Sequence, residues 1–241
     1  MKKVFLTRFA PALLLAGTLA AQVVNTDQNW SSNPPTGNEY WFANGETPNT
    51  WTINGNITVG NGVGPDSRLF VGLGAGGYNA DGILNLVGAN GSGDTLLLNG
   101  CNPADPILGH LGHTDAYRGT LNILGGLAVT WGGRALRIGG NTVTNTINVI
   151  TGSLNYTTPG FSFDDQGGRI MHTMGTNGAI VVAALIDSAT GFDQWGVSKG
   201  MSAGDVLLET EPDFRLVFTQ NQPNTTITAI KPVKGTLIRF Y

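Results

Sequence analysis

A short motif that recurs along the chain constrains the fold more than any other feature. The sequence GILNLVG at residues 82–88 returns as GTLNILG at 119–125 and, more loosely, as NTINVITG at 145–152. The copies begin 37 and 26 residues apart, and each contains an apolar-Asn-apolar-apolar core before a glycine. A repeat of this length is typical of proteins in which one structural unit stacks on the next.

A second and a third type of short segment accompany the motif. The second type reads LFVGLG at 69–74, ILGHLG at 107–112 and LRIGG at 136–140, and ITVGNG at 57–62 resembles an earlier copy of it. All these apolar runs are too short for helices and end at glycine, which favours strands joined by tight corners. The third type comprises 95–100, 127–132 and 153–157.

The composition agrees with an all-β fold. Charged residues make up 12% of the chain, about half the usual share, and 36 of its 241 residues are glycine, about twice the usual share. A chain with so little charge at ordinary hydrophobicity is not disordered, and glycine without a three-residue period excludes collagen. We therefore expect an all-β protein rich in turns.

Two all-β architectures fit many short strands with glycine corners: a parallel β-helix (β-solenoid) and an antiparallel β-sandwich. The repeat favours the solenoid, because equivalent residues stack in register there, whereas successive strands of a sandwich have no reason to share a motif. The solenoid hypothesis predicts two inward ladders, one of Leu84, Leu121 and Ile147 and one of Leu86, Ile123 and Val149.

The asparagines of the motif leave two orientations open. Strict alternation along a strand points Asn85, Asn122 and Asn148 outward. An inward ladder of asparagines, bonded along the stacking axis, is the alternative. It remains open because the residue two positions after each asparagine, on the same face of the strand, is apolar too, namely Val87, Leu124 and Ile150.

The pattern Gly-x-Leu-Asn-Ile-x-Gly-Gly, alternating with Leu-x-Ile-Gly, resembles the autotransporter-passenger-associated repeat of secreted bacterial β-helix surface proteins. The resemblance covers roughly residues 50–160. It implies a right-handed parallel β-helix, exposure at the cell surface, and an adhesive or structural role without defined catalytic residues.

Residues 1–20 are expected to form a signal peptide. Basic residues at 2, 3 and 8 precede an apolar run, and Thr18-Leu19-Ala20 supplies small residues for cleavage. This predicts a secreted, extracellular or cell-surface protein, with the periplasm as an alternative, and no membrane span after cleavage.

The rest of the chain divides into three expected parts. Residues 21–49 form an N-terminal cap segment, 50–178 form the solenoid repeats, and 179–241 form C-terminal coils and antiparallel capping strands. Within the last part, the apolar run 179–186 indicates a doubly buried strand, and 220–224 indicates a hairpin loop.

Charge and cysteine content argue against several functions. Cleavage of residues 1–20 removes three basic and no acidic residues, so the mature chain is more acidic than the full sequence, whose net charge is −3. An acidic, sparsely charged surface gives no reason to bind nucleic acid. Cys101, the single cysteine, cannot form an internal disulfide, and we expect it to be a buried apolar residue.

The adjacent carboxylates Asp164 and Asp165 are the catalytic candidates. With Arg134, Arg137 and Arg169 nearby in sequence, they support an alternative hypothesis, an exported polysaccharide lyase or hydrolase of β-helix type. Neighbours on one strand point to opposite faces, however, and residues 161–168 resemble an ordinary loop. We therefore expect no catalytic residues.

Two further groups of side chains are candidates for binding a metal ion or a sugar. His110 and His113 have no third ligand cluster beside them, so we expect no metal site and no cofactor. Tyr40, Trp41 and Trp51 are candidates for stacking on sugar rings, although aromatic residues in an N-terminal cap more often bury the first coil.

Together these observations predict an exported, non-enzymatic β-solenoid that acts as a cell-surface, matrix or fibre component. Its expected partners are other copies of itself or surface glycans.

Overall fold

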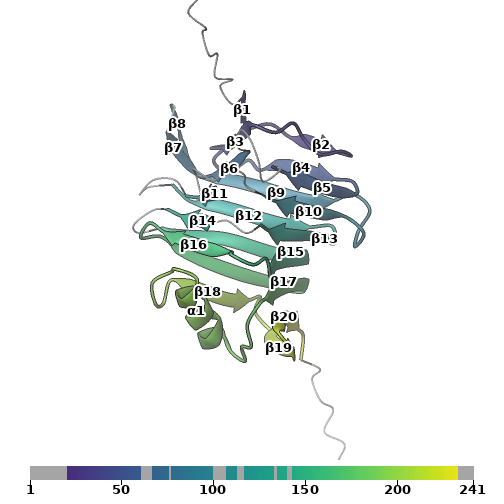
Figure 1. Cartoon of the computed structure of the whole chain (residues 1–241), viewed down its shortest axis with the longest axis vertical. Coiled ribbons are helices and arrows are strands. Elements are labelled where there is room, and N and C mark those ends of the chain that lie inside the picture. The colour runs from purple at the N-terminus through teal and green to yellow at the C-terminus, as the bar shows by residue number, and fades with distance from the viewer. Residues whose placement is uncertain are drawn as a thin grey trace, which may run out of the picture.

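The computed structural model describes residues 21–60, 67–75, 77–99, 107–112, 117–132, 135–139 and 143–232. These residues form twenty strands and one helix (Figure 1). The predictions for residues 1–20, Cys101, His113, Arg134 and the tail after residue 232 concern positions outside these ranges.

One six-stranded sheet, which we call sheet A, is parallel throughout. Its strands, in spatial order, are β1 (Ala21–Val24), β3 (Asn38–Phe42), β6 (Arg68–Val71), β11 (Ile107–Leu111), β14 (Ala135–Ile138) and β16 (Ser162–Asp165).

A twelve-stranded sheet, sheet B, has two halves that share the long strands β15 (Thr144–Tyr156) and β17 (Arg169–Val182). One half adds β2 (Gln28–Trp30), β4 (Asn49–Ile53), β9 (Gly82–Gly88), β12 (Gly119–Leu124) and β18 (Val206–Thr210). The other half adds β5 (Asn56–Val59), β10 (Thr95–Leu98), β13 (Leu127–Trp131), β20 (Asn224–Ile230) and β19 (Arg215–Asn221).

The chain passes repeatedly from sheet A to sheet B and back, and a strand pairs with the equivalent strand of the preceding pass, as β9 does with β4 and β10 with β5 (Figure 1). Within sheets A and B pairing is parallel from β1 to β18, which gives parallel sheets in a nearly closed, barrel-like arrangement around one core. The antiparallel sandwich is therefore wrong. Between two paired strands of one sheet, the chain crosses to the other sheet and comes back. Such a crossover imposes parallel pairing.

The repeat motif occupies β9, β12 and the first part of β15. Leu84 pairs with Leu121 and Leu121 with Ile147, while Leu86, Ile123 and Val149 form a second row. These six side chains are at most 1% exposed and alternate with half-buried neighbours. Removing one such side chain from water contributes about 2 kcal/mol, so the rows form a continuous apolar core.

The motif asparagines lie on the opposite face of sheet B from these rows. Asn122 Nδ2 donates to Asn85 Oδ1 at 2.8 Å, and Asn148 Nδ2 donates to Asn122 Oδ1 at 2.7 Å. All three side chains are half-buried. The asparagines therefore face outward, as alternation predicts, and they are also bonded along the stacking direction.

The glycine that opens the motif is required by a close approach of two strands. A Cβ at Gly82 would overlap the carbonyl oxygen of Phe42, and one at Gly119 would overlap that of Val71. In the third copy the buried Asn145 opens the motif instead. Its Oδ1 accepts from Gly119 N at 2.8 Å, and its Nδ2 donates to Gly139 O at 2.9 Å.

The C-terminal region departs from several expectations. Helix α1 (Ala189–Ser198) was not predicted, and it begins where the Ser188 hydroxyl accepts from Gly191 N at 3.1 Å. The run 179–186 is not doubly buried. Its strand alternates because one face of the sheet points outward, and the strand ends at Val182. Leu185, which follows the strand, is 49% exposed.

Two further local predictions were wrong, and one is confirmed. Residues 162–165 are strand β16 rather than part of a loop, because their backbone pairs with β14. Residues 57–59 belong to β5, which pairs with β10 of sheet B rather than with sheet A. The hairpin loop at 220–224 is confirmed by the antiparallel pair β19–β20.

Aromatic residues fill both ends of the core, whereas its middle is mainly aliphatic. At the N-terminal end the rings of Trp30, Tyr40 and Phe42 surround Trp51, with centroids 4.4 to 5.6 Å from it. At the C-terminal end, helix α1 places Phe192 and Trp195 against rings from β15, β16, β17 and the loop before β16, those of Tyr156, Phe161, Phe163 and His172.

Comparing Leu121→Asp with Asn122→Asp tests the inward and outward assignments. The first variant buries an unpaired carboxylate in the aliphatic row and should cost more than about 4 kcal/mol, enough to prevent folding of many domains. The second removes one hydrogen-bond donor on the outer face and should cost about 1 kcal/mol. Thermal unfolding followed by circular dichroism measures both, and equally small effects would contradict the assignment.

Gly119→Ala should destabilise the protein by about 1–3 kcal/mol, because the added Cβ forces two strands apart. Gly93→Ala is the matched control, since a Cβ there meets nothing within 4 Å. The control should change the free energy of unfolding by less than about 0.5 kcal/mol. Chemical denaturation of both variants provides the measurement, and a tolerated Gly119→Ala would refute the close approach.

Candidate functional site

A groove lies at the corner where the chain passes from sheet A into sheet B. It has a volume of about 440 Å³ and is lined by Gly45, Glu46, Asp81, Ile83, Tyr117, Arg118 and Thr120. These residues come from three stacked turns, which precede β4, β9 and β12, and from the first residues of β9 and β12. The antiparallel hairpin formed by β7 (Leu73–Ala75) and β8 (Tyr78–Ala80) lies directly before Asp81 in the chain and projects at the same side of the molecule (Figure 1).

Hydrogen bonds between the three turns fix the backbone of the groove. Gly45 N donates to the Asp81 carbonyl at 2.8 Å, and Arg118 N donates to Asp81 Oδ1 at 2.7 Å. Gly82 N in turn donates to the Arg118 carbonyl at 2.9 Å. Asp81 thus holds the turns on either side of it, and the groove is formed before any ligand arrives.

Three side chains at the groove have their polar atoms available. Within the described residues, the Glu46 carboxylate, the Tyr117 hydroxyl and the Arg118 guanidinium make no hydrogen bond or ion pair. Glu46 and Arg118 are exposed, and Tyr117 is half-buried. Three other arginines are instead paired with carboxylates, namely Arg68 with Glu39, Arg137 with Asp164 and Arg169 with Asp205.

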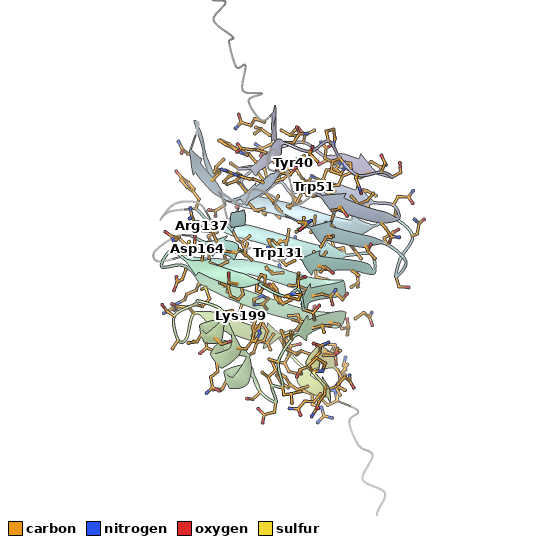
Figure 2. The ribbon with its side chains drawn as sticks, in the orientation of Figure 1. Tyr40, Trp51, Trp131, Arg137, Asp164 and Lys199 are labelled. Atoms are coloured by element: carbon orange, nitrogen blue, oxygen red, sulfur yellow. The ribbon has the colours of Figure 1, made fainter. Side chains whose placement is uncertain are left out.

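The adjacent carboxylates of β16 are not brought together. Asp164 pairs with Arg137, whose Nε lies 2.6 Å from Oδ2, and also accepts from Gln166 Nε2 at 2.8 Å (Figure 2). Asp165 accepts from the backbone nitrogen and hydroxyl of Ser202, at 3.0 and 2.7 Å. Each carboxylate has a separate structural role, and Arg169 pairs with Asp205 at 3.0 Å instead of joining them.

The aromatic candidates for sugar stacking occupy two environments. Tyr40 and Trp51 are 2% and 0% exposed and lie in the N-terminal aromatic cluster, so neither ring offers a face to a solvent-borne sugar (Figure 2). Trp41 points to the other face of sheet A, where its ring packs edge-on against Phe70 with centroids 5.5 Å apart.

His110 stands on β11 between Phe70 and Arg137 in register. The described part of the chain contains no group of three His, Cys, Asp or Glu side chains that could hold a metal ion. Nor does that part contain a helix of the length and apolarity needed to cross a membrane.

His172 is a buried titratable residue that the sequence did not single out. It continues the row of Leu84, Leu121 and Ile147, and its Nε2 lies 2.9 Å from the Tyr156 hydroxyl. Burial lowers the pKa of the His172 imidazole to about 4 and raises the pKa of the Tyr156 phenol. The histidine is therefore neutral at physiological pH and serves the packing of the C-terminal aromatic cluster.

The groove was not predicted from the sequence because its residues are far apart in the chain and belong to no motif of their own. One signal was present. Asp81 and Arg118 each stand directly before the glycine that opens a copy of the repeat, at equivalent positions of two copies. Stacking of the copies predicts that these two residues are neighbours.

No family model matches the chain, and no significant match is found among curated proteins or solved structures. The resemblance to the autotransporter-passenger-associated repeat therefore remains a prediction.

The neutral state of His172 predicts a pH-dependent stability. The unfolded histidine takes up a proton near pH 6.5, whereas the folded one does so near pH 4. The unfolded state binds more protons between these values, so stability is complete above pH 6.5 and falls as the pH drops, by about 3 kcal/mol at pH 4.

Urea denaturation between pH 7 and pH 4 measures this loss. His172→Gln is the control, because its side chain can still bond the Tyr156 hydroxyl but does not titrate. The free energy of unfolding is plotted against pH for both proteins. The difference between their slopes isolates the contribution of His172 from that of the other histidines. Identical slopes would contradict the assignment of a buried neutral imidazole.

Proposed function

We propose that the chain is an exported, non-enzymatic β-solenoid that serves as a structural or adhesive component of a cell surface or extracellular matrix. The observation that carries this proposal is the register of the repeat, in which equivalent apolar residues pair across successive parallel strands. Such stacking builds a stiff body from a simple repeat and leaves its outer faces available for contacts.

The engagement of the candidate catalytic groups supports a non-enzymatic role. A general acid or base has to reach a substrate proton, and hydrolysis needs two carboxylates across one bond. Asp164 is bonded to Arg137 and Gln166, and Asp165 to Ser202. We therefore prefer a scaffold to the alternative of a polysaccharide lyase or hydrolase.

At the C-terminal end of the stack, the edge of sheet A is covered. Phe163 N on the last strand of sheet A donates to the Lys199 carbonyl at 2.7 Å, so the segment after α1 covers this edge (Figure 2). A covered edge cannot pair with the strand of another molecule. Association between copies through strand edges of the C-terminal region would then use the edge strands of sheet B, β18 and β19.

Export is the part of this proposal that rests on residues 1–20, and it can be tested on intact producing cells. An antibody raised against the folded protein should label these cells from outside, and deletion of residues 1–20 should move the protein to the interior. Full-length protein that stays inside would refute the proposed function.

The non-enzymatic character is tested by incubating the purified protein with acidic and neutral polysaccharides. No new reducing ends or unsaturated products should appear, with wild-type protein or with Asp164→Asn. Product release that Asp164→Asn abolishes would instead establish the polysaccharide-active alternative.

A further inference from the structure

We propose that the corner groove of Glu46, Asp81, Tyr117 and Arg118 binds a neutral glycan chain. The inference deepens the proposed function, on which it rests, because it names the site and the class of ligand through which a surface component would adhere. It stands on three observations: the polar side chains that line the groove and have no partner within the described residues, the charge of the groove, and its preformed backbone.

The polar groups suit a ligand with pairs of hydroxyls. A carboxylate accepts two hydrogen bonds, and a guanidinium donates several in a fixed plane, so both can engage neighbouring sugar hydroxyls. Tyr117 adds an apolar ring with a polar tip, which suits the mixed surface of a sugar. Within the described residues, the side chains of Glu46, Tyr117 and Arg118 have no competing partner.

The charge of the groove favours a neutral ligand. The groove is lined by two carboxylates and one guanidinium, and the whole chain has a net charge of −3. Like charges oppose the approach of an anionic polysaccharide such as a polyuronate. A neutral hydroxyl-rich chain meets no such repulsion and can use donors and acceptors of both kinds.

The construction of the groove keeps the cost of binding low. Its three turns are tied by hydrogen bonds of 2.7 to 2.9 Å through Asp81, so the backbone has little freedom to lose. Glu46, Asp81 and Arg118 are exposed rather than enclosed. An open site of this kind can admit an internal segment of a long chain, not merely its end.

Affinity electrophoresis of the full chain is the test. Native gels contain a neutral glucan, a neutral mannan or polygalacturonate as the anionic comparison. We expect retardation in at least one neutral gel and none in polygalacturonate. Tyr117→Ala and Arg118→Ala should each weaken the apparent affinity by about fivefold or more, as for the loss of one hydrogen bond.

Matched controls separate the groove from general surface effects. Arg215→Ala and Glu211→Gln alter exposed residues of the same types elsewhere and should retain wild-type retardation, whereas Glu46→Gln should weaken it. Unfolding midpoints equal to wild type show that a variant is folded.

Absence of retardation in both neutral gels, retardation in polygalacturonate alone, or groove variants that bind like wild type would each overturn the inference. These results are distinguishable from failure of the proposed function. If the antibody labels intact cells but the protein binds no neutral glycan, the surface role stands and the inference about the groove fails. If the protein is confined to the cell interior, the surface role itself fails.

Discussion

The in-register stacking of inward side chains on parallel strands is the interaction on which the rest of this structure depends. Leu84, Leu121 and Ile147 meet because each pass of the chain brings the same position of the motif to the same place. Apolar contact provides the driving force, and parallel hydrogen bonding fixes the spacing. The outer asparagine row and the corner groove are consequences of that stacking, since both join equivalent positions of successive copies.

The corners of the stack show how tightly this register is set. Gly82 and Gly119 leave no room for a Cβ against the end of the neighbouring sheet A strand. In the third copy, Asn145 replaces the glycine and bonds the backbone of Gly119 and Gly139 with its buried amide. At the C-terminal end the aliphatic row gives way to His172, and aromatic rings with helix α1 close the core. The ends thus differ from the middle because they must stop the stacking.

The parallel rows could be predicted from the repeat, and the terminal hairpin from the two alternating runs around residues 220–224. Alternation also predicted outward asparagines, although an inward ladder had remained open. All these features follow from periodicity within one strand or one motif. Helix α1 was missed because its two glycines and its threonine are poor helix formers, and burial of Phe192 and Trp195 overrides that preference. Residues 57–59 were assigned to the wrong sheet because all three types of short segment are apolar runs that end near glycine and look alike. The groove was missed because its residues meet only when three turns stack.

Distances between spin labels test the stacking most directly. Asn56, Thr95, Ala128, Ser153 and Ala179 form one row on the outer face of sheet B. The labels are attached to pairs of cysteines introduced at these positions in a Cys101→Ser background. Because each strand adds about 4.8 Å, we predict about 19 Å between positions 56 and 179 and about 14 Å between 95 and 179. Separations that do not shorten by one strand spacing from the first pair to the second would contradict the in-register parallel stack.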